Sequence, residues 1–389
     1  MKKNIFILGS RGYNFKYGGW ETFVYEFVNN NKDKNTKFYI PYLTFNKEDN
    51  YSFITNGNIN NINLYVPKTG FATMFNFTYK SFKYTIEFLK KNKLSNVYII
   101  VLGCKMGPFM KGFYKKLHAL GAHVIMNPDG LEWKREKWAW WIKQCFKISE
   151  SYHVKYCDKV VCDSKAIKKY IDDKYKRVEK TCFIPYGAYL DDSIEQIDKC
   201  KSFIKDVNIQ EGNYYLYVGR FVPENNIELI ISEYKKSKSD KPLVLVTNYT
   251  KNKFYRHLVK TTNFEFDERI KLVGSVYDKD IIKYLRKNAY AYIHGHKAGG
   301  TNPSLLESLA LTNLNIAFNV SYNKEVGEDA CYYFDYQNSL SNIIRECDNL
   351  KQKEIDDLGK KCKNRIKENY TWEIIEDKYN DVFNELKDN

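Results

Sequence analysis

A glycine-rich segment in the second half of the sequence has the residue types of a phosphate-binding loop. It runs from His294 to Glu307 and reads HGHKAGGTNPSLLE, with Pro303 in the first turn of a predicted helix. Backbone N–H groups at such a helix start bind phosphate, and Glu307, one turn further along, can accept hydrogen bonds from a ribose diol. The segment therefore predicts a nucleotide site. The residues of this segment that we expect to bind the nucleotide are Gly300, Thr301, Asn302, Ser304 and Glu307.

Two histidines, His294 and His296, open this segment. At a strand end this spacing points both side chains to the same face, an arrangement that also occurs in metal sites. No third ligand accompanies them in the sequence, so we expect no metal. We place both imidazoles near the transferred group or its acceptor.

An arginine follows another predicted strand, at Gly219-Arg220. A guanidinium at a strand end can hold a diphosphate through charge-assisted, bidentate hydrogen bonds. The alternative interpretation is a surface ion pair. We expect Arg220 to bind a diphosphate and to stabilise it as a leaving group.

Glycines also follow the first predicted strand, in GSRG at 9–12 and in YGGWET at 17–22. Glycine lets the bare backbone approach a ligand, and the start of a helix near Trp20 could bind negative charge. The alternatives are a nucleotide loop of another class and a simple tight turn. G-x-G-x-x-G is absent here, which disfavours an NAD enzyme. We expect Gly18 and Gly19 to contact a phosphorylated ligand and Arg11 to lie near it.

Two carboxylates follow a further predicted strand, in the segment NPDGLEWKR at 127–135. Catalytic groups collect at strand ends. We therefore expect Asp129 to be catalytic and Glu132 to lie near the bound substrate. The alternative is that Asp129 caps a helix.

Two stretches of the first half, 105–116 and 133–143, mix cations with large apolar side chains. Such surfaces bind acidic lipid headgroups while inserting aromatic rings at the membrane interface. The alternative is that the tryptophans belong to the core and the lysines to a solvated face. The residues expected to touch a membrane are Lys111, Lys115, Lys116, Trp138, Trp140 and Trp141.

The overall charge agrees with an anionic partner. Of 389 residues, 62 are Lys or Arg and 47 are Asp or Glu, which gives a net charge of +15 at pH 7. Nucleic acid, acidic lipid or a phosphorylated substrate would suit such a surplus. No run of about 18 apolar residues is present, and the apolar stretch at 5–9 is too short for a signal-peptide core. We therefore expect a cytoplasmic protein without a spanning helix.

The nine cysteines are scattered and form no C-x-x-C pair. An odd number without such spacing disfavours a disulfide framework and a zinc site in a cytosolic protein. We expect most of them to pack as small hydrophobic residues.

Short β-rich runs alternate with amphipathic stretches in both halves of the chain. The predicted strands are 4–8, 37–42, 63–66, 96–102, 123–127, 159–162, 214–218, 243–247, 270–273 and 289–294. The predicted helices are 20–29, 73–91, 136–157, 227–236, 278–288, 303–311 and 372–386. This alternation predicts parallel sheets with helical crossovers, and ligands sit at the carboxyl ends of such strands.

The fold class is therefore α/β, with two Rossmann-like domains facing across a cleft. We expect the N-terminal domain to span 1–190 and to bind the acceptor, and the C-terminal domain to span 191–371 and to bind a nucleotide donor. A polar linker is expected within 187–212. The tail at 372–389 is expected to form a helix that packs back on the first domain.

The segment from His294 to Glu307 resembles the donor-nucleotide motif of the family 4 retaining glycosyltransferases, which have the GT-B fold. That motif has two glutamates eight positions apart; Glu307 matches the second, and Gly299 stands where the first would be. The segment from Gly219 resembles the family's G-R-x-x-x-E-K phosphate segment, with Asn225 where lysine is usual.

Two further segments extend this resemblance over nearly the whole chain. The run 129–135 is similar to a family segment whose first residue is often a histidine near the transferred sugar; here it is Asp129. The segments 10–23 and 294–307 together resemble the bacterial branch that makes β-1,4-linked rhamnose in cell-wall and capsular polysaccharides. The resemblance implies transfer, with retention, of L-rhamnose from dTDP-L-rhamnose onto a polyprenyl-diphosphate-linked saccharide at the inner face of the plasma membrane.

The departures from the family pattern shape what the resemblance implies. Gly299 removes a group that would contact sugar hydroxyls, and Asn225 removes one phosphate charge, for which Lys251 and Lys253 are candidate replacements. Both changes fit a deoxysugar donor, and we include Lys253 in the donor site. In many enzymes of this fold basic groups and a helix N-terminus replace a metal, so we expect no cofactor and a metal-independent reaction.

Three alternatives stay open on the sequence. One is a glycosyltransferase of the same fold that uses another nucleotide sugar, such as a UDP-hexose. Another is a sugar-nucleotide epimerase, which would change the nucleotide sugar without an acceptor. The third is a nucleic-acid-binding protein, suggested by the charge; it lacks a recognisable binding module, and we expect no nucleic-acid partner.

Overall fold

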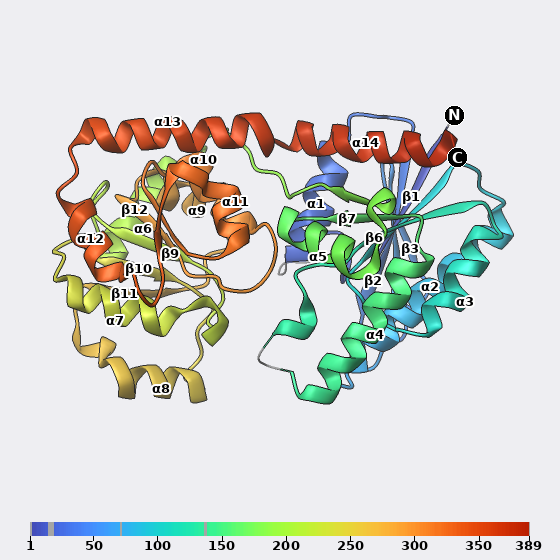
Figure 1. Ribbon diagram of the computed structural model, residues 1–389, viewed down its shortest axis with the longest axis horizontal. Coiled ribbons are helices and arrows are strands. Elements are labelled where there is room, and N and C mark those ends of the chain that lie inside the picture. Colours follow the sequence, from blue (N-terminus) through green and yellow to red (C-terminus); the bar gives the residue numbers. More distant parts are fainter. Residues whose placement is uncertain (1, 15–18, 71, 136–137, 389) are drawn as a thin grey trace. The chain divides into compact units, whose positions relative to one another are not determined.

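The computed structural model describes residues 2–14, 19–70, 72–135 and 138–388 (Figure 1). The chain divides into two compact units. We call Met1–Tyr186 together with Trp372–Asn389 the N-terminal unit, and Gly187–Thr371 the C-terminal unit.

The N-terminal unit is built on an eight-stranded sheet. Its order is β3-β4-β2-β1-β5-β6-β7-β8, and only the β3–β4 pair is antiparallel. The strands are β1 (Lys3–Leu8), β2 (Thr36–Thr44), β3 (Phe53–Asn56), β4 (Ile59–Tyr65), β5 (Val97–Leu102), β6 (Ala122–Asn127), β7 (Lys159–Cys162) and β8 (Thr181–Phe183). All six residues of β5 are buried, as expected for a central strand covered on both faces.

Helices cover both faces of this sheet. They are α1 (Gly19–Asn30), α2 (Ala72–Asn92), α3 (Phe109–His118), α4 (Trp140–Tyr156), α5 (Lys165–Tyr175) and α14 (Trp372–Asp388). The short 3-10 turns η1 (Glu132–Lys134) and η2 (Val178–Lys180) precede α4 and β8.

The C-terminal helix α14 belongs to the N-terminal unit, as the sequence predicted. The Tyr379 ring packs 4.8 Å from that of Phe27 in α1, and Tyr98 of β5 donates to the Phe383 carbonyl at 2.9 Å. Lys159 at the start of β7 pairs with Glu385 at 2.6 Å. These contacts place the last helix over the central strands of the first sheet.

The C-terminal unit is built on a six-stranded parallel sheet of order β11-β10-β9-β12-β13-β14. The strands are β9 (Tyr215–Val218), β10 (Leu243–Val246), β11 (Ile270–Gly274), β12 (Ala291–His294), β13 (Asn315–Phe318) and β14 (Cys331–Phe334). The helices are α6 (Ile197–Val207), α7 (Ile227–Ser237), α8 (Lys253–Thr262), α9 (Lys279–Lys287), α10 (Pro303–Leu311), α11 (Ser321–Gly327), α12 (Leu340–Asp348) and α13 (Gln352–Asn369). The 3-10 turns are η3 (Pro223–Asn225), η4 (Phe264–Phe266) and η5 (Glu328–Ala330).

Separate hydrophobic clusters fill the two faces of the second sheet. Tyr217 and Ile293 point to one face with α7, and Tyr214 and Tyr292 point to the other with α6 and α9. This alternation along neighbouring strands buries large side chains on both sides, so the loops at the strand ends rest on a packed base.

One sequence expectation is corrected by the structure. The helix expected from 136 begins at Trp140, after η1 and an extended Arg135. The segment 187–212, within which a linker was expected, also contains α6, which buries Cys200 and Ile204 in the C-terminal unit. In the described part of the chain, no helix is long and apolar enough to cross a bilayer.

Candidate functional site

The loop between β12 and α10 carries the glycine-rich segment. Pro303 is the first residue of α10, and the Asn302 side chain caps the helix by accepting from the Ser304 N–H at 3.0 Å. Gly299 has φ +132°, a conformation that favours glycine, and Gly300 and Thr301 are buried beside it. Since the Asn302 cap already engages the Ser304 N–H, a phosphate at this helix start must share or displace that cap.

Glu307 is held by an arginine that the sequence analysis missed. Arg286, in the last turn of α9, pairs with Glu307 at 2.6 Å, and its Nη2 donates to the Ser304 hydroxyl at 3.1 Å. The Arg286 side chain is only 5% exposed, whereas that of Glu307 is 40% exposed. Tyr292 joins this network through its hydroxyl, 2.7 Å from Ser304 Oγ. Glu307 thus has a fixed orientation and retains solvent access, which a diol-binding carboxylate needs.

The Arg220 turn lies at the carboxyl end of β9. Asn225 donates from Nδ2 to the Arg220 carbonyl at 2.9 Å, and Asn248 accepts from the next N–H, that of Phe221, at 3.0 Å. The Asn225 side chain is buried, so the position where the family has lysine serves here to close the turn. The Arg220 side chain is exposed, and no ion pair involves it in the described ranges, so the surface ion pair of the alternative interpretation is not formed.

Close backbone contacts join this turn to the glycine-rich loop. Asn226 donates to the Gly295 carbonyl at 2.9 Å, and a Cβ on Gly295 would lie 2.3 Å from the Asn225 carbonyl oxygen. A Cβ on Gly219 would lie 3.0 Å from His296. Arg220 and the start of α10 therefore belong to one cluster of loops at the carboxyl edge of the sheet.

His294 and His296 point to the same side, as their spacing predicted, with ring centroids 4.4 Å apart. Both are buried, and no hydrogen-bond partner lies within reach of either His294 nitrogen or of His296 Nδ1 in the part of the chain that is described. Burial lowers the pKa of His296 to about 3, with a contribution from the Arg220 charge, and lowers that of His294 well below its usual value. Both imidazoles are neutral at pH 7.

Lys253 is the first residue of α8, where its side chain is exposed. Among the described residues, no group of three His, Cys, Asp or Glu side chains is arranged to hold a metal ion.

The first loop of the N-terminal unit follows β1. Gly9 has φ +107°, and a Cβ there would lie 2.2 Å from the Leu102 carbonyl oxygen. Glu21, buried in the first turn of α1, accepts from the Arg11 N–H at 3.0 Å and so ties the loop to the helix. Gly19 begins α1, while the expected donor contact Gly18 lies outside the described residues.

Asp129 sits at the carboxyl end of β6 in a left-handed conformation with φ +61°. The helix-cap alternative is wrong, because η1 begins at Glu132 and has no side-chain cap. Arg135 pairs with Glu132 at 2.7 Å and lies 3.9 Å from Asp129 Oδ2. Burial is the largest influence on Asp129 and raises its pKa, partly opposed by Arg135. The neighbouring Lys105 has its pKa lowered by burial.

A buried carboxylate in α4 braces this loop. Glu150 accepts from Trp133 Nε1 at 3.1 Å, from the hydroxyls of Tyr170 and Tyr175 at 2.8 and 2.7 Å, and from Lys174 at 3.0 Å. The hydrogen bond to Glu150 fixes the Trp133 side chain, and with it the turn that carries Glu132, against α4. The sequence analysis missed this role because nothing in the local pattern links α4 to α5.

The residues expected at a membrane divide into two groups. Trp140 and Trp141, in the first turn of α4, are 75% and 62% exposed. Trp138 is half-buried: its Nε1 donates to Glu132 at 2.8 Å and its ring packs 5.6 Å from that of Phe146. The core alternative therefore fits Trp138 but not Trp140 or Trp141. The expected lysines, all exposed on α3, are Lys111, Lys115 and Lys116.

Two models of known protein families match this chain, and they divide it near the boundary between the two compact units. Residues 2–189 match the model "Domain of unknown function (DUF1972)", and residues 200–369 match the model "Glycosyl transferases group 1". No curated protein matches the sequence.

Solved structures with the same fold cover nearly the whole chain. HepE from Anabaena, in complex with UDP, has a TM-score of 0.73 at 12% identity over 98% of this chain and 100% of its own. Sucrose-phosphate synthase from Thermosynechococcus elongatus has a TM-score of 0.77 at 15% identity over 99% of both chains. A glycosyltransferase from Rickettsia africae has a TM-score of 0.74 at 15% identity over 100% and 99%. The expected GT-B fold is confirmed.

Proposed function

From the group 1 glycosyl transferase match of residues 200–369, we infer that this protein moves a sugar from a nucleotide-sugar donor to an acceptor. The observation that carries this inference is the loop cluster of the C-terminal unit, where the exposed Arg220 and the helix start at Pro303 share one edge with Glu307. A guanidinium, a helix N-terminus and a fixed carboxylate are the groups that a nucleoside diphosphate needs.

Each donor-binding group has a distinct role in this proposal. Glu307, oriented by Arg286, accepts hydrogen bonds from the ribose hydroxyls. Arg220 and the N-terminus of α10 hold the diphosphate and stabilise the charge that develops on it as the sugar leaves. Asn225 stands where the family has a lysine, and its amide closes the Arg220 turn and carries no charge. We therefore assign the second positive charge at the diphosphate to Lys253.

His296 lies directly beneath the phosphate-binding turn, since Gly219 leaves no space for a side chain between them. The neutral imidazole can donate or accept a hydrogen bond without adding charge. We place His294 and His296 near the transferred sugar on this basis.

In the N-terminal unit we assign the reaction's carboxylate to Asp129. Its left-handed backbone and the salt bridge between Arg135 and Glu132 hold it at the carboxyl end of β6. As a carboxylate it would stabilise the oxocarbenium-like transition state or orient the acceptor hydroxyl. We propose that the sugar is transferred with retention and without a metal ion.

We propose dTDP-L-rhamnose as the donor, on the strength of the rhamnosyltransferase-like segments and of Gly299 where the family has a glutamate. A UDP-hexose is the competing donor, and it is favoured by solved structures of the same fold that contain UDP or UDP-2-fluoro glucose. We further propose that the acceptor is a polyprenyl-diphosphate-linked saccharide and that exposed residues of α3 and α4 bring the enzyme to the membrane surface.

The proposal is tested by a panel of nucleotide sugars, measured first for thermal stabilisation and then for hydrolysis and transfer. Stabilisation by dTDP-rhamnose above UDP-glucose supports the rhamnose assignment, and the reverse order supports the UDP-hexose. An altered nucleotide sugar in the absence of any acceptor would instead indicate an epimerase. Stabilisation by none of the panel would contradict the donor site.

The ribose role of Glu307 is tested separately by calorimetry with the free nucleoside diphosphate. Glu307→Ala should weaken binding by about 1–3 kcal/mol, because the hydroxyls lose a charged acceptor. Glu328→Ala, at an exposed glutamate of the same unit that pairs with Arg365, is the matched control. Unchanged affinity in Glu307→Ala would exclude the ribose role.

A further inference from the structure

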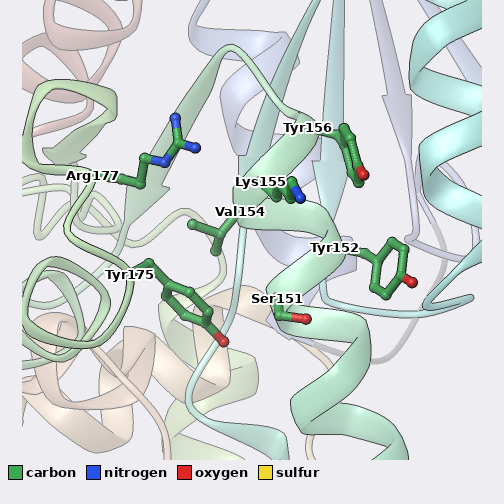
Figure 2. Close-up of a pocket in the computed structure, with 7 residues that line it drawn as sticks. All are labelled: Ser151, Tyr152, Val154, Lys155, Tyr156, Tyr175 and Arg177. Atoms are coloured by element: carbon green, nitrogen blue, oxygen red, sulfur yellow. The ribbon is translucent and has the colours of Figure 1, made fainter.

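The N-terminal unit contains a pocket away from the carboxyl edge of its sheet. It has a volume of about 450 Å³ and lies between the C-terminal half of α4 and the segment after α5 (Figure 2). Its lining residues are Ser151, Tyr152, Val154, Lys155, Tyr156, Tyr175 and Arg177.

The pocket is separate from the proposed catalytic site. Its α4 residues lie just before β7 begins at Lys159. Tyr175, the last residue of α5, and Arg177 lie just before β8 begins at Thr181. It therefore borders the amino ends of these two strands, whereas substrates of parallel sheets bind at the carboxyl ends.

Two cations line this pocket, and a third lies beside one of its tyrosines. Lys155 and Arg177 line it. Lys111 of α3 lies near the lining residue Tyr156: the Nζ atoms of Lys111 and Lys155 lie 5.9 and 5.5 Å from the Tyr156 ring centroid. None of the three cations pairs with a carboxylate in the described ranges. The Tyr175 hydroxyl is engaged with Glu150, so the cations are the groups that could bind an anionic oxygen group such as a phosphate.

An apolar stripe on α4 leads to the pocket. Trp141, Ile148, Tyr152 and Lys155 are spaced by 7, 4 and 3 residues, which places them on one face of the helix. Trp141 and Ile148 are largely exposed. Phe109, at the start of α3, is also largely exposed, and α3 is tied to α4 where the Gly107 N–H donates to Ser149 at 2.8 Å.

An apolar helix face that ends in cations and tyrosines matches a membrane interface, where apolar groups enter the acyl region and cations meet phosphates. We propose that this pocket binds the phosphate of an anionic phospholipid and thereby holds the outer face of α4 against the bilayer. The proposal rests on the membrane association proposed above and adds a specific headgroup site to it.

The test compares two variants that lose the same charge. Lys155→Gln with Arg177→Gln empties the pocket of its cations, whereas Lys90→Gln with Lys91→Gln removes two exposed cations from the last turn of α2. Partition onto phosphatidylcholine vesicles, with and without phosphatidylglycerol, is measured by sedimentation. We expect the pocket variant to partition about 25-fold more weakly onto the anionic vesicles, at about fivefold per cation, and the α2 variant to change by less than about twofold.

Three outcomes would overturn the proposal: equal losses in both variants, which would indicate a diffuse charge effect; wild-type partition of the pocket variant; and no preference of the wild type for anionic vesicles. Melting midpoints confirm that each variant is folded, and Lys111→Gln, at an exposed position, gives a second measurement with an expected fivefold loss. Inorganic phosphate at millimolar concentration is added in a parallel arm. If it stabilises the wild type but not the pocket variant, while both proteins partition alike onto the vesicles, the site takes free phosphate and the lipid assignment is wrong.

Sugar transfer is assayed without vesicles, on a detergent-solubilised acceptor. A failed transfer assay would therefore not affect the conclusion from vesicle binding. A failed vesicle assay would likewise not affect the conclusion about sugar transfer.

Discussion

Burial of His296 should make the C-terminal unit sensitive to acid. Its pKa is about 3 in the folded protein, against a usual value near 6.5 in an unfolded chain. Because the folded pKa is the lower one, the unfolded state binds the proton first as the pH falls. The stability of the unit is then fully present above about pH 6.5 and is lost progressively below it.

The size of this loss follows from the two pKa values. Each pH unit between them costs about 1.4 kcal/mol, so His296 alone should lower the free energy of unfolding by about 2 kcal/mol between pH 6.5 and pH 5. The loss would approach about 5 kcal/mol near pH 3. Replacement by a side chain that does not titrate, His296→Gln, should remove this part of the pH dependence.

The assay must report on the C-terminal unit alone. All six tryptophans lie in the N-terminal unit, so tryptophan fluorescence does not follow the other unit. Hydrogen exchange of peptides from β9 and β12, measured at pH 7 and pH 5 with correction for intrinsic exchange, gives the local free energy of opening. His257→Gln removes an exposed histidine from the same unit and serves as the control. If His296→Gln and wild type lose the same stability between the two pH values, the buried-imidazole reasoning is refuted.

Three further predictions concern transfer and membrane binding. Arg220→Ala should lower kcat by about 10²-fold or more, because one preorganised charge at the leaving group is lost; an unchanged kcat with a raised KM would make its role simple binding. Asp129→Asn should strongly reduce transfer but not nucleotide affinity in calorimetry, and wild-type transfer by this variant would remove Asp129 from the reaction. Replacing Lys111, Lys115 and Lys116 together with Glu should abolish sedimentation with anionic vesicles, whereas high salt alone should release most of the wild type; unaltered sedimentation of the triple variant would exclude α3 from the interface.

The sequence was most informative where local pattern determines structure. The buried runs of β1 and β5 and the Pro303 helix start were predicted to within a residue or two, because apolar runs and Pro at a first turn have local causes. The common direction of His294 and His296 follows from the period of a strand. Strand β3 was missed, because its four residues are all exposed and carry no apolar run.

The parts of the candidate site that escaped prediction depend on contacts distant in sequence. Arg286 of α9 forms an ion pair with Glu307, and Glu150 accepts hydrogen bonds from α5 and from the loop before α4. Asn225 looks like a lost phosphate ligand in the sequence, yet in the structure its amide closes the Arg220 turn. No local pattern encodes which polar side chain will meet which, since that choice is made when the elements pack.

The position of α14 has a consequence for how the chain reaches its native state during synthesis. The C-terminal unit is one uninterrupted segment, Gly187–Thr371, so all its strands are available before the last helix is made. The N-terminal unit is not one uninterrupted segment. Phe27 and Tyr98 contact residues of α14 that are synthesised some 280 to 350 residues later. The half of the protein that is translated first should therefore be the second to be completed, with part of its apolar surface uncovered in the meantime.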